Sequence, residues 1–396
     1  MRNISFIKSV FIISALIYGV LLLLNAIVKP KNGWDHHQVE YNNFPVLVAH
    51  RGGRGIYAEN TLEAMKISYY KYHVDLLECD IQMTKDNKFV LLHDYWLNRT
   101  TNIKGQVKDF TLAELKKVDA GYWFTEDGKT YPLRGKGITM TTLNELLDEF
   151  YGKDVRISIE LKDKVSASVD LLIQELKKYP NINKQVCIDC SYHPMQVYFR
   201  QQVGNMYCTE NDEVEGLSMG LAGALGLSRL YYFLNPNNVE YFFAPYLSMK
   251  GFDVLSDGFY KVLQDELDAP FMYFTVNNEI EMARAIGLGA KGILTDRPDV
   301  AHKVFVALGL RNDVVNNTKE NEHYHVPSAR TSWEFSNQAM KILETAGGLL
   351  PKEVLSFIVI SIPVTILLAI YSIIAFIVSI IYNILCCRKS KKNKTN

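Results

Sequence analysis

The sequence of 396 residues predicts an α/β protein whose main domain, residues 45–310, is a TIM (β/α)₈ barrel. Short β-rich runs alternate with amphipathic helical patterns, which is typical of βαβ units and a parallel sheet. Polar residues end at least five of these runs. A barrel gathers its active site from the C-terminal ends of all its strands, whereas a doubly wound sheet uses only its switch point. The closed barrel is therefore the favoured fold.

The expected elements follow one another along the chain with short connections. Strands are predicted at residues 46–49, 76–82, 89–92, 155–161, 185–189, 205–208, 241–245, 271–276 and 292–294. Helices are predicted at residues 61–72, 111–118, 142–149, 167–179 and 279–286, where apolar residues recur at helical spacing. Residues 89–92 are a candidate extra strand, and a small insertion after the second strand covers about residues 94–140.

Two apolar segments flank this domain and predict transmembrane helices. Residues 10–28 carry no charge over 19 residues, and residues 354–387 carry none over 34. We expect the first to be an uncleaved anchor, with a cleaved signal peptide as the alternative. We expect the second to be an interfacial lead-in followed by one span, with a two-span hairpin as the alternative. The remaining segments are a tail (1–9), a linker (29–44), a stalk (311–353) and a basic tail (388–396).

The charges around these segments predict a topology. Five basic residues follow the second segment, so its C-terminal side is expected in the cytoplasm and the domain at residues 45–310 in the lumen or outside the cell. Lys392 and Lys394 stand fifth and third from the end, a spacing that resembles an endoplasmic-reticulum retrieval signal. The formal net charge is zero, so no nucleic-acid partner is expected. The sequence does not determine the oligomeric state.

Residues 216–249 are unusually apolar and aromatic, but glycines and an Asn-Pro-Asn turn interrupt them. Two interpretations are open: a barrel helix with its loop, or an insertion that touches the bilayer.

Three carboxylates predict a site for a divalent cation. Glu78 and Asp80 are two residues apart in a predicted strand, so their side chains share one face. Like charges at such a distance repel unless a cation lies between them. Glu160, at the end of another predicted strand, would complete an oxygen-rich set of ligands, which suits Mg²⁺ or Ca²⁺ better than zinc.

Two histidines also end predicted strands. His50 follows residues 46–49 and His93 follows residues 89–92. Imidazole titrates nearest to neutral pH, so the two histidines are candidates for a general acid and a general base. Arg51 and Lys162 supply cations of the kind that contact phosphate oxygens. Together these residues predict metal-dependent phosphoryl transfer to water or to a hydroxyl group.

The order of these motifs carries a family resemblance. They are His50-Arg51-Gly52, Glu59-Asn60-Thr61, Glu78-x-Asp80, Thr84-x-Asp86, His93-Asp94, Arg99-Thr100-Thr101, Glu160-Leu161-Lys162, Thr275-Val276-Asn277 and Thr295-Asp296-Arg297-Pro298. The series, within residues 45–308, resembles the glycerophosphodiester phosphodiesterase family. The resemblance implies an acid–base pair and one divalent ion (Mg²⁺ or Ca²⁺). His50 and His93 match that pair, and Glu78, Asp80 and Glu160 match the metal ligands.

The resemblance also assigns the surrounding residues. It implies that Arg51 and Lys162 contact the substrate phosphate. The residues that it implies shape the pocket are Glu59, Asn60, Phe274 and Asn277. Phe274 stands where the family usually has tryptophan, which keeps an apolar wall but removes the indole N–H.

Three functions are compatible with these residues. The first is hydrolysis of glycerophosphodiesters, such as glycerophosphocholine or glycerophosphoinositol, to glycerol 3-phosphate and an alcohol. The second keeps this chemistry but acts on lysophospholipids, as a lysophospholipase D. The third is a catalytically silent membrane receptor or scaffold, against which the intact histidines and carboxylates argue. The sequence does not decide between a cyclic-phosphate route and direct attack by water.

Overall fold

The computed structural model of the chain describes residues 2–28, 45–212, 214–216, 218, 222, 225–234, 239–245, 271–287 and 289–311. The strands are β1 (Val46–Ala49), β2 (Leu76–Met83), β3 (Phe89–Leu91), β4 (Arg156–Leu161), β5 (Val186–Cys190), β6 (Cys208–Glu210), β7 (Val239–Pro245), β8 (Phe271–Phe274) and β9 (Gly292–Thr295). The helices are α1 (Arg2–Ile27), α2 (Leu62–Tyr72), α3 (Leu112–Leu115), α4 (Leu143–Phe150), α5 (Ser166–Leu176), α6 (His193–Val203), α8 (Ser228–Leu234), α10 (Glu279–Gly287) and α11 (Pro298–Ala307). Short 3-10 turns are η1 (His50–Gly52), η2 (Leu97–Arg99), η3 (Val107–Asp109) and η4 (Ile182–Lys184).

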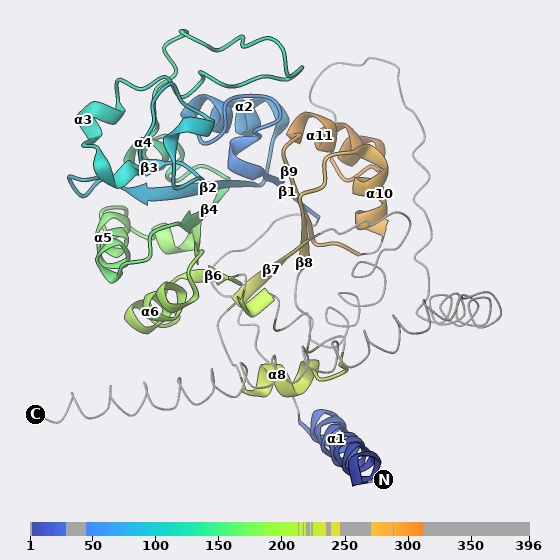
Figure 1. Cartoon of the computed structure of the whole chain (residues 1–396). Coiled ribbons are helices and arrows are strands. Elements are labelled where there is room, and N and C mark those ends of the chain that lie inside the picture. The colour runs from blue at the N-terminus through green and yellow to red at the C-terminus, as the bar shows by residue number, and fades with distance from the viewer. Residues whose placement is uncertain are drawn as a thin grey trace, which may run out of the picture. The chain divides into compact units, whose positions relative to one another are not determined.

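The strands form one curled sheet in the order β1-β9-β8-β7-β6-β5-β4-β2-β3 (Figure 1). All neighbours are parallel except β2 and β3. Because β1 pairs with both β9 and β2, the parallel strands close on themselves. This arrangement is consistent with the predicted (β/α)₈ barrel.

Alternation along each strand decides which side chains enter the barrel. Val46 and Val48 of β1 belong to one buried cluster with Leu76 of β2, Cys187 of β5 and Met272 of β8. A separate and larger cluster contains the intervening strand residues together with the inner faces of the helices. Strands covered on both faces are expected to be mainly apolar, as β1 and β3 are, whereas β2 and β4 also carry Glu78, Asp80 and Glu160. Residues at every second position after the members of the first cluster, such as His50 after Val48, point toward the mouth of the barrel.

Threonine N-caps fix where several helices begin. The Oγ1 atom of Thr142 accepts the Glu145 N–H at 3.1 Å, and Glu145 Oε2 accepts the Thr142 N–H at 2.8 Å. This capping box satisfies two backbone donors at the start of α4. Thr61 and Thr111 cap α2 and α3 in the same way, the latter with Glu114. The predicted helix over residues 111–118 is in fact shorter, because α3 ends at Leu115.

The chain between β2 and α4 forms a small layer beside the barrel. β3 runs antiparallel to β2, with Leu91 opposite Ile81. The residues that follow enclose their own apolar core, which consists of Val90, Leu92, Leu97, Val107, Leu115, Val118, Ala120, Ile138 and Met140. This core holds the end of β3, and therefore His93, at the mouth of the barrel.

Two further regions bear on the sequence analysis. The described residues of the apolar stretch 216–249 include α8 and β7, and β7 pairs with β6 and β8 in the barrel sheet. Contact of this stretch with a bilayer stays a prediction. Cys187 and Cys208, which are register partners on β5 and β6, form a disulfide with a Cα–Cα distance of 4.5 Å.

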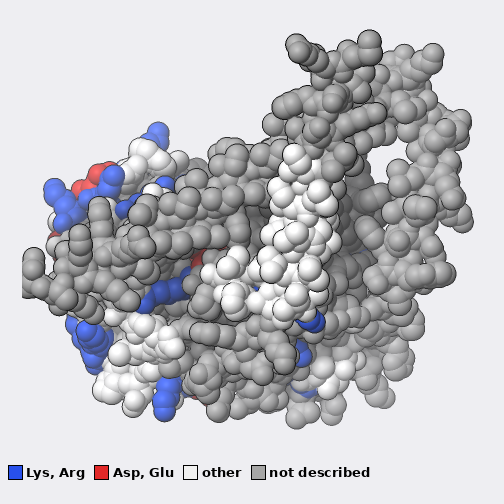
Figure 2. All heavy atoms as spheres, turned by 90° about the horizontal axis from the view of Figure 1, so that it is seen from below, with Lys and Arg blue, Asp and Glu red and all other residues white. Residues whose placement is uncertain are grey.

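Helix α1 contains the first predicted membrane span. None of the helices among the described residues combines the length and apolarity needed to cross a membrane. The predicted transmembrane helix at residues 10–28 is therefore wrong, and so is the integral-membrane localisation with a lumenal or extracellular catalytic domain. The prediction depended on the absence of charged residues from this segment. In Figure 2 the described atoms of α1 are white, the colour of residues other than Lys, Arg, Asp and Glu. That criterion ignores the polar contacts of α1: the Tyr18 hydroxyl donates to the Leu225 carbonyl, and Asn25 accepts the Leu230 N–H, both at 2.9 Å. The predicted segments 29–44, 354–387 and 388–396 lie outside the described residues.

Candidate active site

Strand register brings the three predicted metal ligands together at the mouth of the barrel. Asp80 of β2 lies opposite Glu160 of β4, and Glu78 lies one inward-facing position below Asp80. Ligand oxygens of these three residues all lie within 4.8 Å of one another. The predicted cluster of carboxylates is therefore present.

Each carboxylate is held by a specific donor. The Arg51 N–H donates to Glu78 Oε2 at 2.6 Å, and the Asn60 amide donates to Asp80 Oδ2 at 2.9 Å. The Ser191 hydroxyl donates to Glu160. These contacts restrict the rotamers of the three side chains, which is the support that a metal site requires around its ligands.

Lys162 is the principal cation of the cluster. Its Nζ atom lies 2.9 Å from Asp80 Oδ1 and 2.5 Å from Glu160 Oε1. Burial acts to lower the pKa of Lys162, but the two carboxylates outweigh it and raise the pKa above its ordinary value. Lys162 therefore stays charged and partly neutralises the cluster from one side.

The electrostatics of the cluster fit a bound divalent cation. Burial and the neighbouring Asp80 raise the pKa of Glu78 well above its ordinary range. Burial opposes ionisation of Asp80 as well, but Lys162, His93 and Arg51 outweigh it and lower the pKa of that carboxyl. A set of three converging carboxylates, two of them buried, is the oxygen donor set that Mg²⁺ or Ca²⁺ prefers.

His50 is fixed by a residue from the last strand. Its Nδ1 atom lies 2.6 Å from Asp296 Oδ1, and Asp296 directly follows β9. Asn277 donates to Asp296 Oδ2 at 2.9 Å and accepts the Asp296 N–H at 2.9 Å, so it orients the carboxylate. Burial lowers the pKa of His50 below 6.5, although the hydrogen bond with Asp296 acts in the opposite direction. The imidazole is thus neutral near pH 7, and its Nδ1–H donates to the Asp296 carboxylate.

His93 belongs to a chain of charged residues on the other side of the mouth. Its Nδ1 atom lies 2.9 Å from Asp94 Oδ1, and Asp94 pairs with Arg99 at 2.5 Å. Arg99 also holds Glu59, at 2.6 and 2.8 Å, and Glu59 in turn accepts from Arg51 at 3.1 Å. Glu59, predicted to shape the pocket, therefore links Arg51 to the residues around His93.

The turn after β1 has the backbone geometry that this arrangement needs. Arg51 has φ of 51° and Gly52 has φ of 75°, both in the left-handed region. This bend aims the Arg51 N–H at Glu78. A Cβ atom on residue 52 would meet Met65 Sδ at 2.8 Å, so the turn requires glycine both for its φ and for the packing of α2.

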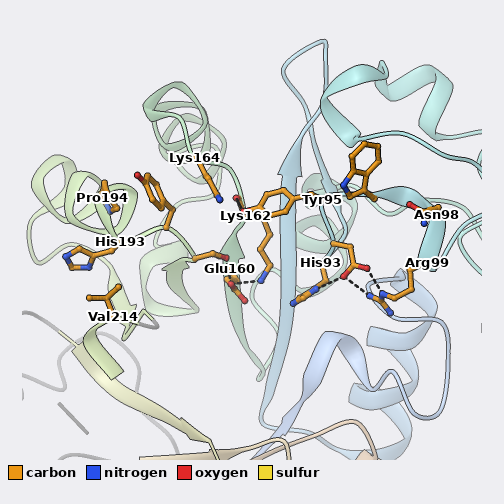
Figure 3. A pocket seen from close by; sticks show the side chains of 14 residues that line it. His93, Tyr95, Asn98, Arg99, Glu160, Lys162, Lys164, His193, Pro194 and Val214 are labelled. Carbon is orange, nitrogen blue, oxygen red and sulfur yellow. Dashed lines mark hydrogen bonds and ion pairs between the residues drawn. The ribbon is translucent and has the colours of Figure 1, made fainter. Parts of the chain in front are cut away.

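A pocket of about 1100 Å³ opens above the carboxylates. It is lined by His93, Asp94, Tyr95, Trp96, Asn98, Arg99, Glu160, Lys162, Lys164, Ser191, Tyr192, His193, Pro194 and Val214. Figure 3 shows Glu160 and Lys162 in its centre, with His93 and Arg99 on one side and His193 on the other. Of the predicted site residues, three line this pocket: His93, Glu160 and Lys162.

The other predicted residues lie beside or beneath the lining. Asp80 connects to the lining through Lys162, and Arg51 connects through Glu59 and Arg99 and also holds Glu78. His50 contacts Asp296, which is outside the lining. Phe274 is 36% exposed and is not part of this lining. Its role in shaping the pocket stays a prediction, as do the other individual roles.

Several residues of the site were not assigned a role from the sequence. Asp296 ends a predicted strand, which marked it as a candidate, but its pairing with His50 depends on barrel closure. Asp94 and Arg99 belong to the quoted motifs, whereas Ser191 does not; the contacts of all three show what they do. Nothing in the sequence pattern singled out Lys164 or His193.

Comparison with known proteins agrees with this geometry. Residues 50–188 match the Glycerophosphoryl diester phosphodiesterase family. The Glycerophosphodiester phosphodiesterase of Bacillus subtilis (strain 168) is 33% identical over 311 residues, covering 74% of this chain and 97% of that protein. The enzyme of the same name from Bacillus altitudinis is 29% identical over 266 residues, covering 65% and 97%.

Solved structures share the fold. A glycerophosphoryl diester phosphodiesterase domain from Mycobacterium tuberculosis has a TM-score of 0.56 at 18% identity, covering 66% of this chain and 99% of that one. A phosphodiesterase from Oleispira antarctica, in complex with the product sn-glycerol-3-phosphate, has a TM-score of 0.53 at 20% identity, covering 68% and 100%. From the extent of the match to its Bacillus relative, the chain belongs to the glycerophosphodiester phosphodiesterase family and is a phosphoric diester hydrolase.

Proposed function

We propose that this enzyme cleaves glycerophosphodiesters to glycerol 3-phosphate and an alcohol, with His50 as general base and His93 as general acid. The observation that carries the assignment is the contact of 2.6 Å between His50 Nδ1 and Asp296 Oδ1. A histidine whose Nδ1–H is bound to a carboxylate keeps a lone pair on Nε2, ready to accept a proton. Burial, which lowers the pKa of His50, keeps that lone pair free at neutral pH.

The two histidines would divide the proton transfers of one displacement at phosphorus. His50 takes the proton of the attacking oxygen as its bond to phosphorus forms. His93 gives a proton to the alcohol oxygen as the bond from phosphorus to that oxygen breaks. The attacking oxygen belongs either to water or to the 2-hydroxyl of the glycerol, in which case water opens the cyclic phosphate afterwards.

Glu78, Asp80 and Glu160 would hold one divalent cation, Mg²⁺ or Ca²⁺. Their convergence within 4.8 Å and the raised pKa of Glu78 support this role. When bound, such a cation neutralises charge on phosphoryl oxygens. Lys162 already contacts two of these carboxylates and would contact the same phosphate group, with Arg51 contributing a guanidinium from beneath.

The test replaces each histidine by glutamine and measures release of the alcohol from glycerophosphocholine and glycerophosphoglycerol. We expect kcat to fall by about 10²- to 10⁴-fold in H50Q and in H93Q. His302→Gln, on α11 and away from the pocket, is the matched control and should retain activity. Full activity in H50Q would overturn the assignment.

Two comparisons of substrates test the remaining alternatives, which are lysophospholipase D activity and the cyclic-phosphate route. Comparing each glycerophosphodiester with the acylated lysophospholipid of the same head group tests the lysophospholipase D alternative. A substrate that lacks the glycerol 2-hydroxyl tests the route. Loss of turnover with normal binding of that analogue would support the cyclic phosphate, and unchanged turnover would support direct attack by water.

A further inference from the structure

We propose that Lys164 and His193 form a second anion-binding subsite, which holds an anionic group on the alcohol part of the substrate. This subsite rests on the proposed function, because it supposes that the diester phosphate lies near Glu160 and Lys162. Both residues line the same pocket as His93 but stand outside the proposed catalytic and metal-binding residues. Figure 3 shows His193 across the pocket from His93, with Glu160 between them.

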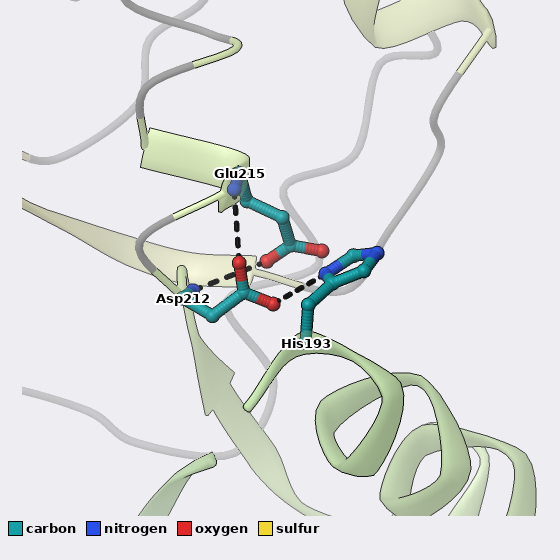
Figure 4. Close-up of side chains that lie close together, drawn as sticks. All are labelled: His193, Asp212 and Glu215. Atoms are coloured by element: carbon teal, nitrogen blue, oxygen red, sulfur yellow. Dashed lines mark hydrogen bonds and ion pairs between the residues drawn. The ribbon is translucent and has the colours of Figure 1, made fainter. Parts of the chain in front are cut away.

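His193 is held in place by Asp212 and is not a loose surface side chain. Its Nδ1 atom lies 2.6 Å from Oδ2 of Asp212, which is 1% exposed. The other oxygen of that carboxylate accepts the Glu215 N–H at 2.9 Å, so Asp212 cannot turn away (Figure 4). The hydrogen bond with Asp212 raises the pKa of His193. With Nδ1–H bound to Asp212, the protonated imidazole also presents Nε2–H to a ligand, whereas the neutral ring presents a lone pair there.

The group formed by His193, Asp212 and Glu215 has the residue types of a metal site, but its charges do not suit one. Arg200 holds both oxygens of Glu215, one of them at 3.0 Å. A cation there would have to displace this guanidinium and also deprotonate His193. The network instead fixes the orientation of the imidazole at the edge of the pocket, where its protonated form can donate a hydrogen bond.

The charge balance of the pocket favours an additional anion. Its two lining carboxylates already have partners: Asp94 binds Arg99 and Glu160 binds Lys162, each at 2.5 Å. Among the described residues, no carboxylate pairs with Lys164, whose ammonium remains in excess. A diester carries one negative charge at phosphorus, so a second anionic group on the substrate would match this excess.

The surroundings of Lys164 also argue against a cationic alcohol. Its Nζ atom lies 5.1 Å from the centre of the Tyr95 ring and 5.7 Å from that of Tyr192. Aromatic faces of this kind bind quaternary ammonium groups, but here a lysine already occupies both of them. The subsite therefore fits a carboxylate or phosphate on the alcohol better than choline.

The experiment compares two diesters of glycerol 3-phosphate that differ in one group. Glycerophosphoglycerol has a hydroxymethyl group where glycerophosphoglycerate has a carboxylate. We expect wild-type kcat/KM to be about tenfold higher for glycerophosphoglycerate, since one charge-assisted contact is worth about that factor. K164M and H193Q should each remove most of this preference without lowering kcat for glycerophosphoglycerol. Lys136→Met, at an exposed position outside the pocket, is the matched control and should keep the preference.

The ratio of kcat/KM for the two diesters should also depend on pH. If His193 had only a structural role, this pH dependence would not be expected. The ratio of the two kcat/KM values cancels the titration of the catalytic histidines, because both substrates undergo the same reaction. It should decline in wild type as the pH rises through the pKa of His193, above 6.5, and stay level in H193Q. The charged groups that face His193 are Asp212, Glu215 and Arg200, and Tyr231 of α8 lies near the same carboxylates.

The outcomes separate this subsite from the proposed function. If wild type cleaves neither diester, the proposed function fails. If wild type cleaves both with equal kcat/KM, and neither K164M nor H193Q changes the ratio, the enzyme assignment stands and the subsite is overturned. A ratio that favours the carboxylate, and that both substitutions abolish, supports the subsite.

Discussion

His50 Nδ1 and Asp296 Oδ1 lie 2.6 Å apart although 246 positions separate the two residues in the chain. The first and last strands of the barrel are neighbours, with Ala49 opposite Thr295, and each of the two residues directly follows its strand. The hydrogen-bond geometry of the proposed base is therefore a property of the closed barrel. Asn277 and Arg54 bind the same carboxylate at 2.9 and 2.8 Å and hold it in place.

Replacing Asp296 by asparagine should impair catalysis far more than folding. An amide at this position can present its N–H to Nδ1, which would place the histidine proton on Nε2 and remove the lone pair needed there. We expect kcat/KM to fall by about 10²- to 10⁴-fold. Asp299→Asn is the control, because Asp299 binds Arg297 instead of His50. Equal activity in the two variants would show that the tautomer of His50 does not matter.

The acid limb of the pH profile should reflect His50. Burial lowers its pKa below 6.5, so the neutral, proton-accepting form persists to more acidic pH than for an exposed histidine. As the pH falls through that pKa, the base becomes protonated and kcat/KM should decline tenfold per unit. Measuring kcat/KM from pH 4.5 to 8 tests this, with an NMR titration of the His50 ring to identify the group. A limb centred above pH 7 would contradict the assignment.

Removal of divalent cations should abolish turnover. A chelator should reduce kcat to background, and Mg²⁺ or Ca²⁺ should restore it, because the three carboxylates form the oxygen-rich site that such ions prefer. Glu160→Gln should weaken metal binding by about 10- to 100-fold, measured by calorimetry. Glu145→Gln removes a carboxylate from the capping box of α4, outside the metal site, and is the matched control for Glu160→Gln. Unchanged activity after chelation would show that the reaction does not depend on a divalent cation.

Asp163 should make the protein less stable as the pH rises. Its Oδ2 atom accepts the Met83 N–H at 2.8 Å, and burial raises its pKa to about 6, compared with 3.8 for an ordinary aspartate. The folded state therefore binds more protons between these values, so the stabilising effect is full below pH 3.8 and is lost as the pH rises through 6. D163N keeps an acceptor without the charge. It should be about 1–2 kcal/mol more stable than wild type at pH 8, after allowance for partial exposure, and no more stable at pH 4.

Urea unfolding at the two pH values measures this difference. Asp154→Asn, at an exposed position, is the matched control and should show no such pH dependence. An equal effect of D163N at pH 4 and pH 8 would mean that ionisation of Asp163 is not responsible.

The fold and the principal site residues could be predicted because they depend on local pattern. Alternation in β2 places Glu78 and Asp80 on one face whatever the strand pairs with, and polar residues at strand ends indicate the mouth of a parallel barrel. Glu160 joined the set because it ends a strand in the same way. The structure brings all three together, as expected.

Contacts that depend on register or closure could not be predicted in this way. No spacing rule pairs His50 with Asp296, Cys187 with Cys208, or His193 with Asp212, since each pair joins different strands or their ends. The error at residues 10–28 has another origin. A hydropathy prediction considers a segment without its neighbours in space. It therefore cannot include the contacts of Tyr18 with Leu225 and of Asn25 with Leu230.

Closure of the barrel between β1 and β9 has a consequence for biosynthesis. A nascent chain that has emerged only as far as β8 already contains every carboxylate of the metal cluster, both histidines and Lys162, yet lacks Asp296. Its His50 has no partner, so the proposed base is not assembled. If His50 is the base, as proposed, hydrolytic competence depends on the final strand.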